Sequence, residues 1–420
     1  MSALTSFRGA AKCMEIILPK LAVRAPSWTT AQNWVLRAGL HRLQKPLPLR
    51  GDWALAMDQS INIGSKKVTL VLASSLESIR KRKFKLRHKD MHVAAISIES
   101  SCDGHRIARI LEDVALRIGC PAQIVTDGGT NLAKGIRIFR QAHPKVAATL
   151  DITHRAALLF KKKLENDVRW KEFTECVREC KRKAVLTDLA WAAPPKPRDK
   201  SRWQNLEPFA GWAERTLAML EAPGGRGRPS KAAKDRRARL EGMFGWIRGF
   251  ESEVAEWSDC LAVAAKARSC VKSEGLRKDS ADIFRNSLGS EAKRESSARM
   301  AEELAAFMES QAGELPDGIP WLGCSDVIES VFGKYKIFTS RSPLVEVGKA
   351  VLAIPLMTAD VTEAEIAEAM KSVSCEDVKK WLDENVGRSL LAKRQELSKR
   401  CGIKNKMKKF EFLIPKAACF

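Results

Sequence analysis

The chain has 420 residues and a mass of 46.7 kDa, which is too long for one ordinary hydrophobic core, so two or three domains are expected. Its 73 Lys and Arg residues against 50 Asp and Glu residues give a net charge of +23, which favours a polyanionic partner, most often nucleic acid. No apolar run approaches the roughly 18–20 residues of a membrane span. The 11 cysteines contain no CxxC pair, so a membrane protein, a zinc-finger protein and a disulfide-rich secreted scaffold are excluded.

Strand and helix signals alternate from residue 51 to residue 160. They follow a short N-terminal segment, residues 1–50, in which one helix is expected at 29–40. The first and second strands are joined by a short turn and should be antiparallel, whereas helices connect the third, fourth and fifth strands, which should be parallel. A three-stranded meander followed by βαβαβ matches a ribonuclease-H-like sheet and differs from a dinucleotide-binding fold, which begins with βαβ. The expected strands are residues 53–58, 68–73, 93–98, 122–126 and 146–150.

Amphipathic helical patterns dominate the second half of the chain. Residues 161–322 are expected to form an all-helical insertion, in which 223–239 is a basic loop between two helices. A further helix of the core should open at Ser325 and Asp326, within the segment 323–345. Residues 346–420 should form a helical C-terminal region with a basic tail. The expected fold class is an α/β ribonuclease-H-like core with a mixed five-stranded sheet, interrupted by a large all-α insertion.

Two aspartates stand at the ends of apolar strands. Asp58 ends W-A-L-A-M-D and shares a strand face with Ala54 and Ala56, where a buried carboxylate is costly unless it is paired or binds a metal. Asp127 stands in I-V-T-D-G-G, at a strand end where open sheets place ligands. Either aspartate alone fits a strand-end cap equally well. In a ribonuclease-H-like order the first and fourth strands are neighbours, so the two carboxylates are expected to converge.

Two further motifs carry candidate functional residues. The tetrad D-I-T-H, with Asp151 and His154, follows the fifth strand, and its simpler interpretation is a helix-capping aspartate with a surface histidine. Glu329 lies in S-D-V-I-E-S-V-F-G-K-Y-K, where helical spacing places it on one stripe with Lys336 that a DNA backbone could approach. The alternative for Glu329 is an ordinary solvated glutamate. The packing side of this helix should carry Ile328, Val331, Phe332 and Tyr335.

Taken together, these residues resemble the active-site set of the DDE transposases. The closest resemblance is to the hAT-like branch, with its C/DxxH tetrad, its R-W dipeptide (here Arg202-Trp203) and its long helical insertion before the last acid. The resemblance covers roughly residues 50–340. It implies an enzyme that cleaves DNA at transposon ends and transfers the strands, with Asp58, Asp127 and Glu329 as catalytic residues.

The resemblance also implies a metal cofactor. Asp58, Asp127 and Glu329 would hold two Mg²⁺ ions, for which Mn²⁺ can substitute, and hard Mg²⁺ prefers oxygen ligands. Two such ions neutralise the charge of a phosphodiester and activate the attacking oxygen. Asp151, His154 and Lys336 would lie behind the ligands or position the DNA.

Basic segments mark the expected DNA contacts. Residues 80–89 (RKRKFKLRHK) carry seven Lys and Arg residues near the expected active-site edge and should grip phosphates, although a solvated loop is the alternative. G-R-G-R-P at 225–229 is similar to the core of an AT-hook, and a flexible basic linker is equally consistent. Trp203 could stack on an unpaired base or belong to a core. The expected DNA-binding residues are Arg80, Lys81, Arg82, Lys83, Lys85, Arg87, Arg202, Trp203, Arg226 and Arg228.

The expected partner is double-stranded DNA, bound by a dimer or a higher oligomer because two element ends must be brought together. No membrane is involved, and the localisation expected for a bacterial source is cytoplasmic, associated with the nucleoid. Two alternatives stay open. A ribonuclease-H-fold nuclease such as a junction resolvase would be smaller and would lack the insertion. A DNA-binding protein without catalysis, or a shortened transposase copy, would fit the mere 57 residues before Asp58, but all three acids are intact.

Overall fold

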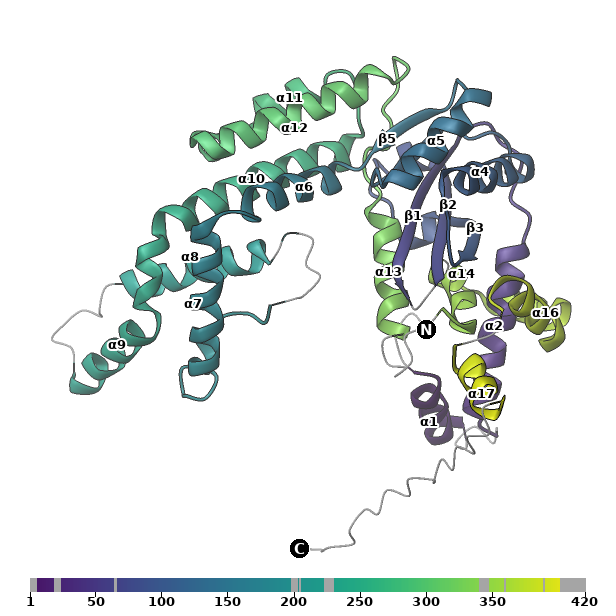
Figure 1. Cartoon of the computed structure of the whole chain (residues 1–420), viewed down its shortest axis with the longest axis horizontal. Helices are drawn as coiled ribbons and strands as arrows, with labels where there is room; N and C mark the ends of the chain where they lie inside the picture. The colour runs from purple at the N-terminus through teal and green to yellow at the C-terminus, as the bar shows by residue number, and fades with distance from the viewer. Residues whose placement is uncertain are drawn as a thin grey trace, which may run out of the picture.

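The chain folds into a strand-containing core and a long arm of helices that extends to one side of it (Figure 1). The computed structural model describes residues 6–18, 24–63, 66–197, 203, 205–222, 230–339, 347–358, 360–387 and 390–400. Within these residues, no helix combines the length and the apolar character needed to cross a membrane.

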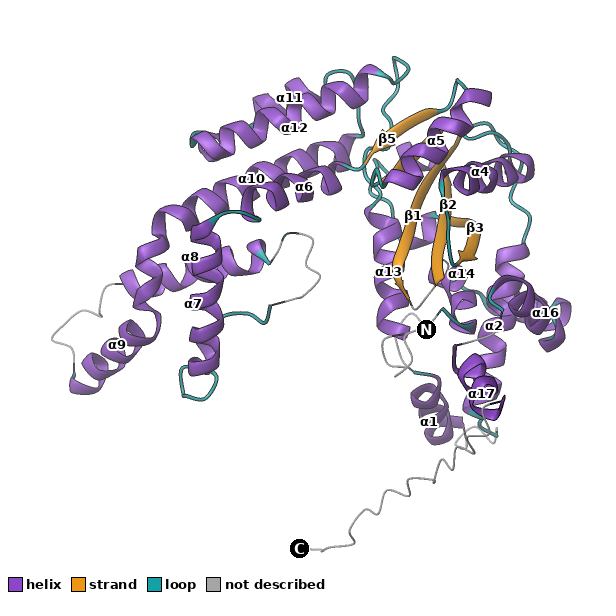
Figure 2. Cartoon of the chain, in the orientation of Figure 1, coloured by secondary structure: helices purple, strands orange, loops and turns teal. Residues whose placement is uncertain are grey.

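The core is built on a mixed five-stranded sheet (Figure 2). Its strand order is β3-β2-β1-β4-β5; β2 is antiparallel to both β1 and β3, whereas β4 is parallel to both β1 and β5. This is the ribonuclease-H-like order expected from the sequence, so that prediction is confirmed. The hairpin of β1 and β2 extends beyond the apolar part of the first strand, with Gln59 paired to Thr69. The strands are β1 (Trp53–Ile63), β2 (Lys66–Ser75), β3 (His92–Glu99), β4 (Gln123–Thr126) and β5 (Ala147–Leu150).

Helices cover both faces of the sheet, because alternate residues of β1 are buried on opposite sides. Leu55 and Met57 pack against α4 (Gly104–Ile118) and α5 (Thr130–Ala142). On the other face, Ala56 packs with α13 (Asp326–Thr339) and with α2 (Trp28–Gln44). The apolar side chains that α13 buries include all four expected from its spacing: Ile328, Val331, Phe332 and Tyr335.

The insertion between β5 and α13 is mainly helical in its described residues, with one isolated antiparallel bridge between Leu276 and Trp321. Its core is rich in aromatic rings: those of Trp170 and Phe173 lie 4.9 and 5.0 Å from the ring of Trp257. Helix α6 starts in the core and continues to Leu164, past residue 161, where the insertion was expected to begin. The domain boundaries therefore stay a prediction. The main helices are α6 (Ile152–Leu164), α7 (Val168–Ala184), α8 (Leu206–Glu221), α9 (Lys231–Phe244), α10 (Glu251–Glu274), α11 (Ser280–Ser287) and α12 (Glu295–Gly313).

One part of the insertion differs from the sequence expectation. Residues 223–239 were expected to be a loop, but α9 begins at Lys231 and contains the basic run up to Arg239. The run is helical because Ala, Lys and Arg are strong helix formers, and their dense charge had suggested a loop.

The two ends of the described chain pack together beside the core. The Arg37 side chain of α2 donates hydrogen bonds of 2.5 Å to the carbonyl oxygens of Met370 and Val373. Helix α2 is therefore held by the C-terminal helices, and it is longer than the predicted 29–40. The remaining helices are α1 (Phe7–Ile17), α3 (Leu76–Lys81), α14 (Ile354–Met357), α15 (Glu363–Ser372), α16 (Cys375–Asn385) and α17 (Leu390–Arg400).

Candidate active site

Asp58 lies on β1, on the sheet face that α13 covers. It follows Ala54 and Ala56 on that face, where both alanines are fully buried, and its own side chain is half-buried. Its Oδ1 accepts a hydrogen bond of 2.6 Å from the amide of Gln59. The strand thus carries an ionisable group to the limit of the apolar packing without enclosing it, which avoids the full cost of burying a charge.

Asp127 follows directly after β4, the neighbour of β1. The two strands are parallel and pair Ala56 with Val125, so Asp58 and Asp127, each two residues further on, stand at the same level and on the same side. Asp127 is half-buried, and its Oδ1 accepts a hydrogen bond of 2.9 Å from the amide of Gly129. Gly128 has a φ of +82°, a conformation that favours glycine and turns the chain sharply into α5.

Glu329 lies in the first turn of α13 and is half-buried. Because Ile328 and Val331 on either side of it pack onto the same sheet face as Ala56, Glu329 stands close to the face that carries Asp58. Lys336, two turns later, is exposed, with its Nζ 6.0 Å from the centroid of the Phe332 ring. The DNA-facing stripe with Glu329 and Lys336 stays a prediction.

A different group of side chains converges most closely. Among the described residues, Asp151, Cys324 and Asp326 form the one set of three possible ligands whose atoms all lie within 4.8 Å of one another, and the expected triad is not such a set. Asp326 forms an ion pair with Lys272, and burial, followed by the charges of Asp151 and Asp326, raises the pKa of Cys324 to about 12.

Asp151 has a clear structural use. Its Oδ1 accepts hydrogen bonds from the amides of Thr153 (2.6 Å) and His154 (3.2 Å) at the start of α6. Its Oδ2 accepts from the amide (2.7 Å) and the hydroxyl (2.6 Å) of Ser325, just before α13. The buried carboxylate thus joins the first helix of the arm to the helix that carries Glu329. The D-x-x-H tetrad predicts the Asp151 cap on α6. The hydrogen bonds between Asp151 and Ser325 join positions 174 residues apart, so no local sequence pattern predicts them.

The basic segment 80–89 contacts α13, but not as expected over its whole length. The chain leaves β2 at Ser75, which pairs with Trp53 at the start of β1, and the basic segment follows soon after. Its first residues therefore leave the sheet at the end opposite to Asp58. For these residues the expected position near the active site is wrong. Its second half returns to α13, where His88 Nε2 lies 2.9 Å from Ser330 Oγ and Lys334 Nζ lies 2.7 Å from His88 Nδ1. Burial lowers the pKa of His88, and the charge of Lys334 lowers it further.

Most basic side chains of this segment face solvent. Arg80 is half-buried and Arg82 and Arg87 approach Asp90 at 3.1 and 3.6 Å. The sequence analysis did not predict the contacts of His88 with Ser330 and Lys334. The pattern S-x-x-x-K, which places Ser330 and Lys334 one turn apart, indicates a polar side of α13. The exposed members are Lys81, Arg82, Lys83, Lys85, Arg87 and Lys89.

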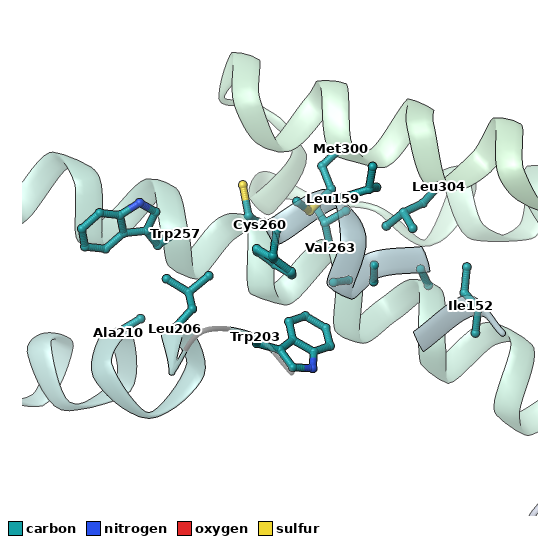
Figure 3. Close-up of a cluster of buried hydrophobic side chains, with 14 of the residues drawn as sticks. Ile152, Leu159, Trp203, Leu206, Ala210, Trp257, Cys260, Val263, Met300 and Leu304 are labelled. Atoms are coloured by element: carbon teal, nitrogen blue, oxygen red, sulfur yellow. The ribbon is translucent and has the colours of Figure 1, made fainter. Parts of the chain in front are cut away.

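The remaining expected DNA contacts divide into two groups. Arg202, Arg226 and Arg228 lie outside the described residues. Trp203 is buried in the arm, 9% exposed, with its ring 4.7 Å from that of Phe160 and the Arg268 guanidinium 5.5 Å from its centre (Figure 3). This placement fits the core alternative for Trp203.

No protein-family model matches this chain, and no curated protein matches it either. Among solved structures, the chain is similar to one described as the Drosophila P element transposase strand transfer complex. The match has 13% sequence identity, covers 87% of this chain and 92% of that chain, and has a TM-score of 0.36. The fold assignment rests on the strand order described above.

Proposed function

We propose that this protein is a DNA transposase, which cleaves strands at the ends of a mobile element and joins them to target DNA. The observation that carries the proposal is the shared level and shared face of Asp58 and Asp127 on neighbouring parallel strands, with the Glu329 helix packed over that same face. Three half-buried carboxylates from separate elements at one edge of a ribonuclease-H-like sheet favour phosphodiester chemistry over a purely structural role.

The donor chemistry of these residues fits Mg²⁺, with Mn²⁺ as a substitute. All three offer carboxylate oxygens, which hard divalent cations prefer, and all three are only partly buried. When bound, two such ions would neutralise phosphate charge and lower the pKa of an attacking water or 3′-hydroxyl. Asp58 and Asp127 would hold their oxygens in place through the backbone amides of Gln59 and Gly129.

The proposed partner is double-stranded DNA. The contacts of His88 hold the second half of the segment 80–89 against α13, so a phosphate backbone bound by the exposed Arg87 and Lys89 would pass close to the helix that carries Glu329. Lys336 extends the same positive side of α13. Binding through such side chains releases counterions and weakens steeply as salt rises. We further propose a dimer or higher oligomer, since two ends must be joined, and a cytoplasmic, nucleoid-associated localisation in a bacterial source.

The test is Mg²⁺-dependent nicking of supercoiled plasmid DNA by the full chain. Asp58→Asn, Asp127→Asn and Glu329→Gln should each lower nicking by about 100-fold or more, since loss of a metal ligand removes several kcal/mol of transition-state stabilisation. DNA affinity should stay within about twofold, because each change alters one charge and little volume. Asp113→Asn, on the exposed side of α4 at the opposite face, is the matched control and should leave nicking unchanged.

Full nicking by any one of the three variants would remove that residue from the site. Full nicking by all three would contradict the proposed chemistry. A binding-competent wild-type protein that does not nick any DNA with Mg²⁺ or Mn²⁺ would favour a DNA-binding protein without catalysis.

A further inference from the structure

A cysteine, a histidine and a glutamate form a line at the surface of the core, away from the three carboxylates. Cys120 Sγ lies 3.6 Å from His143 Nδ1, and His143 Nε2 lies 2.9 Å from one carboxylate oxygen of Glu112 and 3.1 Å from the other. Cys120 is exposed, whereas His143 and Glu112 are partly covered. The thiol and the carboxylate therefore contact opposite nitrogens of one imidazole ring.

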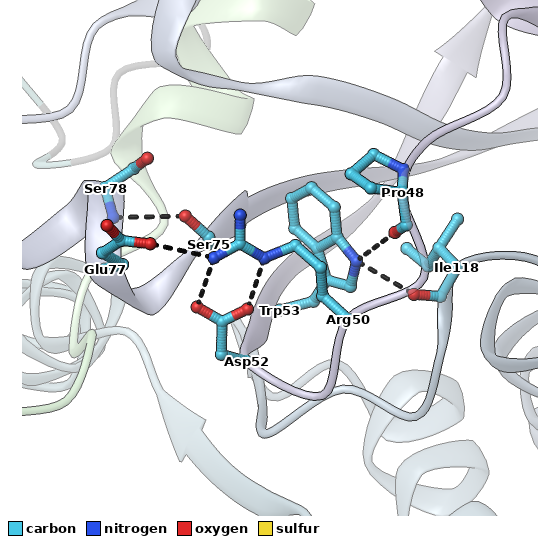
Figure 4. Close-up of polar contacts among 8 residues, drawn as sticks. All are labelled: Pro48, Arg50, Asp52, Trp53, Ser75, Glu77, Ser78 and Ile118. Atoms are coloured by element: carbon cyan, nitrogen blue, oxygen red, sulfur yellow. Dashed lines mark hydrogen bonds and ion pairs between the residues drawn. The ribbon is translucent and has the colours of Figure 1, made fainter.

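Rigid surroundings hold Cys120 in this position. It follows Gly119, whose φ is +96° and where a Cβ would lie 2.3 Å from the carbonyl oxygen of Arg50. The carbonyl oxygen of Ile118, one residue earlier, accepts hydrogen bonds from the amide of Arg50 (2.9 Å) and from the indole of Trp53 (3.0 Å). Figure 4 shows Trp53 reaching Ile118 and Pro48, next to the ion pair of Arg50 with Asp52. The turn before Cys120 is thus tied to the start of β1.

His143 and Glu112 are held equally well by the two helices on this face. His143 is the last residue capping α5, and its ring lies 4.3 Å from the ring of Phe139. Glu112 lies in α4, which packs closely against α5. The close packing depends on Gly135 of α5, since a Cβ at this position would collide with Ile107 of α4. The carboxylate fixes the tautomer: Nε2 carries the proton and donates it to Glu112, so Nδ1 presents a lone pair to the thiol.

This order, nucleophile, base and orienting acid, is the arrangement that activates a thiol. It is unsuited to chelating a metal ion, because the sulfur and the carboxylate lie on opposite sides of the ring and cannot share one ion with it. Burial, followed by the charge of Glu112, raises the pKa of the Cys120 thiol, so the resting group is protonated and needs a base. His143 Nδ1 is that base.

We propose that Cys120 is a reactive thiol that exchanges with low-molecular-weight disulfides such as oxidised glutathione. His143 Nδ1 takes the thiol proton, the Cys120 sulfur attacks one sulfur of the disulfide, and a new S–S bond forms as the old one breaks. The leaving thiolate takes the proton from His143 and departs as a thiol. Cys120 is oxidised to a mixed disulfide and half of the small disulfide is reduced. The proposal does not depend on the transposase function.

The experiment incubates the full-length reduced protein with oxidised glutathione and measures the labelling rate of each cysteine by mass spectrometry of its peptides. Cys13 and Cys375 are built-in references, because both are exposed and no His contact accompanies them in the part of the chain that the structure describes. Cys120 should be labelled at least about tenfold faster than either. His143→Asn should reduce its rate to theirs, and Glu112→Gln should reduce it by a smaller factor.

Folding is monitored in the same samples. Cys260 is fully buried, so it should stay unlabelled in every folded variant. If His143→Asn exposes Cys260, the decision passes to Glu112→Gln, whose Cys120 rate must fall relative to Cys13. The proposal is overturned if Cys120 reacts no faster than Cys13 and Cys375, or if a folded variant of His143 or Glu112 leaves its rate unchanged.

Discussion

The candidate-site carboxylates of the sheet core and the surface carboxylates of the helical arm have different kinds of partner. In the arm, the Arg285 guanidinium forms ion pairs with two carboxylates, those of Glu302 (3.1 Å) and Glu309 (2.5 Å). Hydrogen bonds to these two residues raise the pKa of Arg285 above its usual value. In the core, Asp58 and Asp127 accept hydrogen bonds from the backbone at strand ends and keep part of their surface exposed. Asp58 and Asp127 thus accept hydrogen bonds from backbone amides, whereas Glu302 and Glu309 share one arginine side chain.

The tryptophans of the arm also differ from one another in their surroundings. Trp170, Trp203 and Trp257 are all buried in the arm, where their rings pack against other rings. The exposed tryptophan of the arm is Trp191, which is 71% exposed. The role of a tryptophan or an acid in this protein therefore depends on the part of the fold in which it lies.

Trp203→Ala should produce the largest change in stability. Removing a buried indole should lower the free energy of unfolding by about 3–5 kcal/mol, whereas Trp191→Ala, the exposed control, should change it by less than about 0.5 kcal/mol. Urea denaturation measures both. A Trp203→Ala protein of normal stability, with strand transfer slowed more than nicking, would return Trp203 to the DNA-stacking role.

Asp151→Asn tests the joint between the two regions. The asparagine keeps one acceptor oxygen but its amide cannot accept the hydrogen bonds of Ser325, so the variant should lose about 1–3 kcal/mol of stability. Ser325→Ala removes only the hydroxyl partner and should lose less. Denaturation curves of both variants, followed by nicking assays at a temperature where they are folded, should show reduced nicking because α13 loses its anchor. Unchanged stability in Asp151→Asn would mean that α13 is positioned by its apolar face alone.

Neutralising Lys81, Arg82, Lys83 and Lys85 together tests whether the core face carries the DNA. For each phosphate that these side chains no longer neutralise, the dependence of log affinity on log salt should flatten by about 0.9, equally for all DNA sequences. The matched control neutralises Lys231, Lys234 and Arg236 of α9, exposed in the arm. The opposite result would be a flatter salt dependence for the α9 variant and an unchanged salt dependence for the 81–85 variant. It would indicate that DNA binds to the arm.

The smallest expected effect concerns pH. Burial and Lys334 lower the pKa of His88 in the folded protein below the ordinary value of 6.5, so the unfolded chain binds more protons as the pH falls. The contribution of His88 to stability is complete above pH 6.5 and is lost as the pH falls below that value. His88→Gln should therefore show a weaker loss of stability between pH 7 and pH 5 than the wild type in urea titrations. An identical loss in both proteins would show that His88 is not the group concerned.

Local patterns were sufficient for much of the fold. The five strands, the order of their connections and the packing side of α13 followed from alternation, helical spacing and connection lengths, because these periodicities arise from local backbone geometry. The basic helix α9 was misjudged as a loop because charge density obscured its helix-forming residues. Asp127 and Asp58 could be paired in advance, since neighbouring strands in a known order fix which ends meet.

Sequence alone therefore determined the sheet order, the helical nature of the arm and the strand ends at which the carboxylates stand. Only the tertiary structure decided which side chains meet across long separations. It placed Asp151 against Ser325, His88 against α13 and Cys120 against His143, and it buried Trp203 behind Arg268. The physical reason is that periodicity reports which face a residue occupies, whereas contacts between distant segments depend on how whole elements pack, and that packing has no local signature.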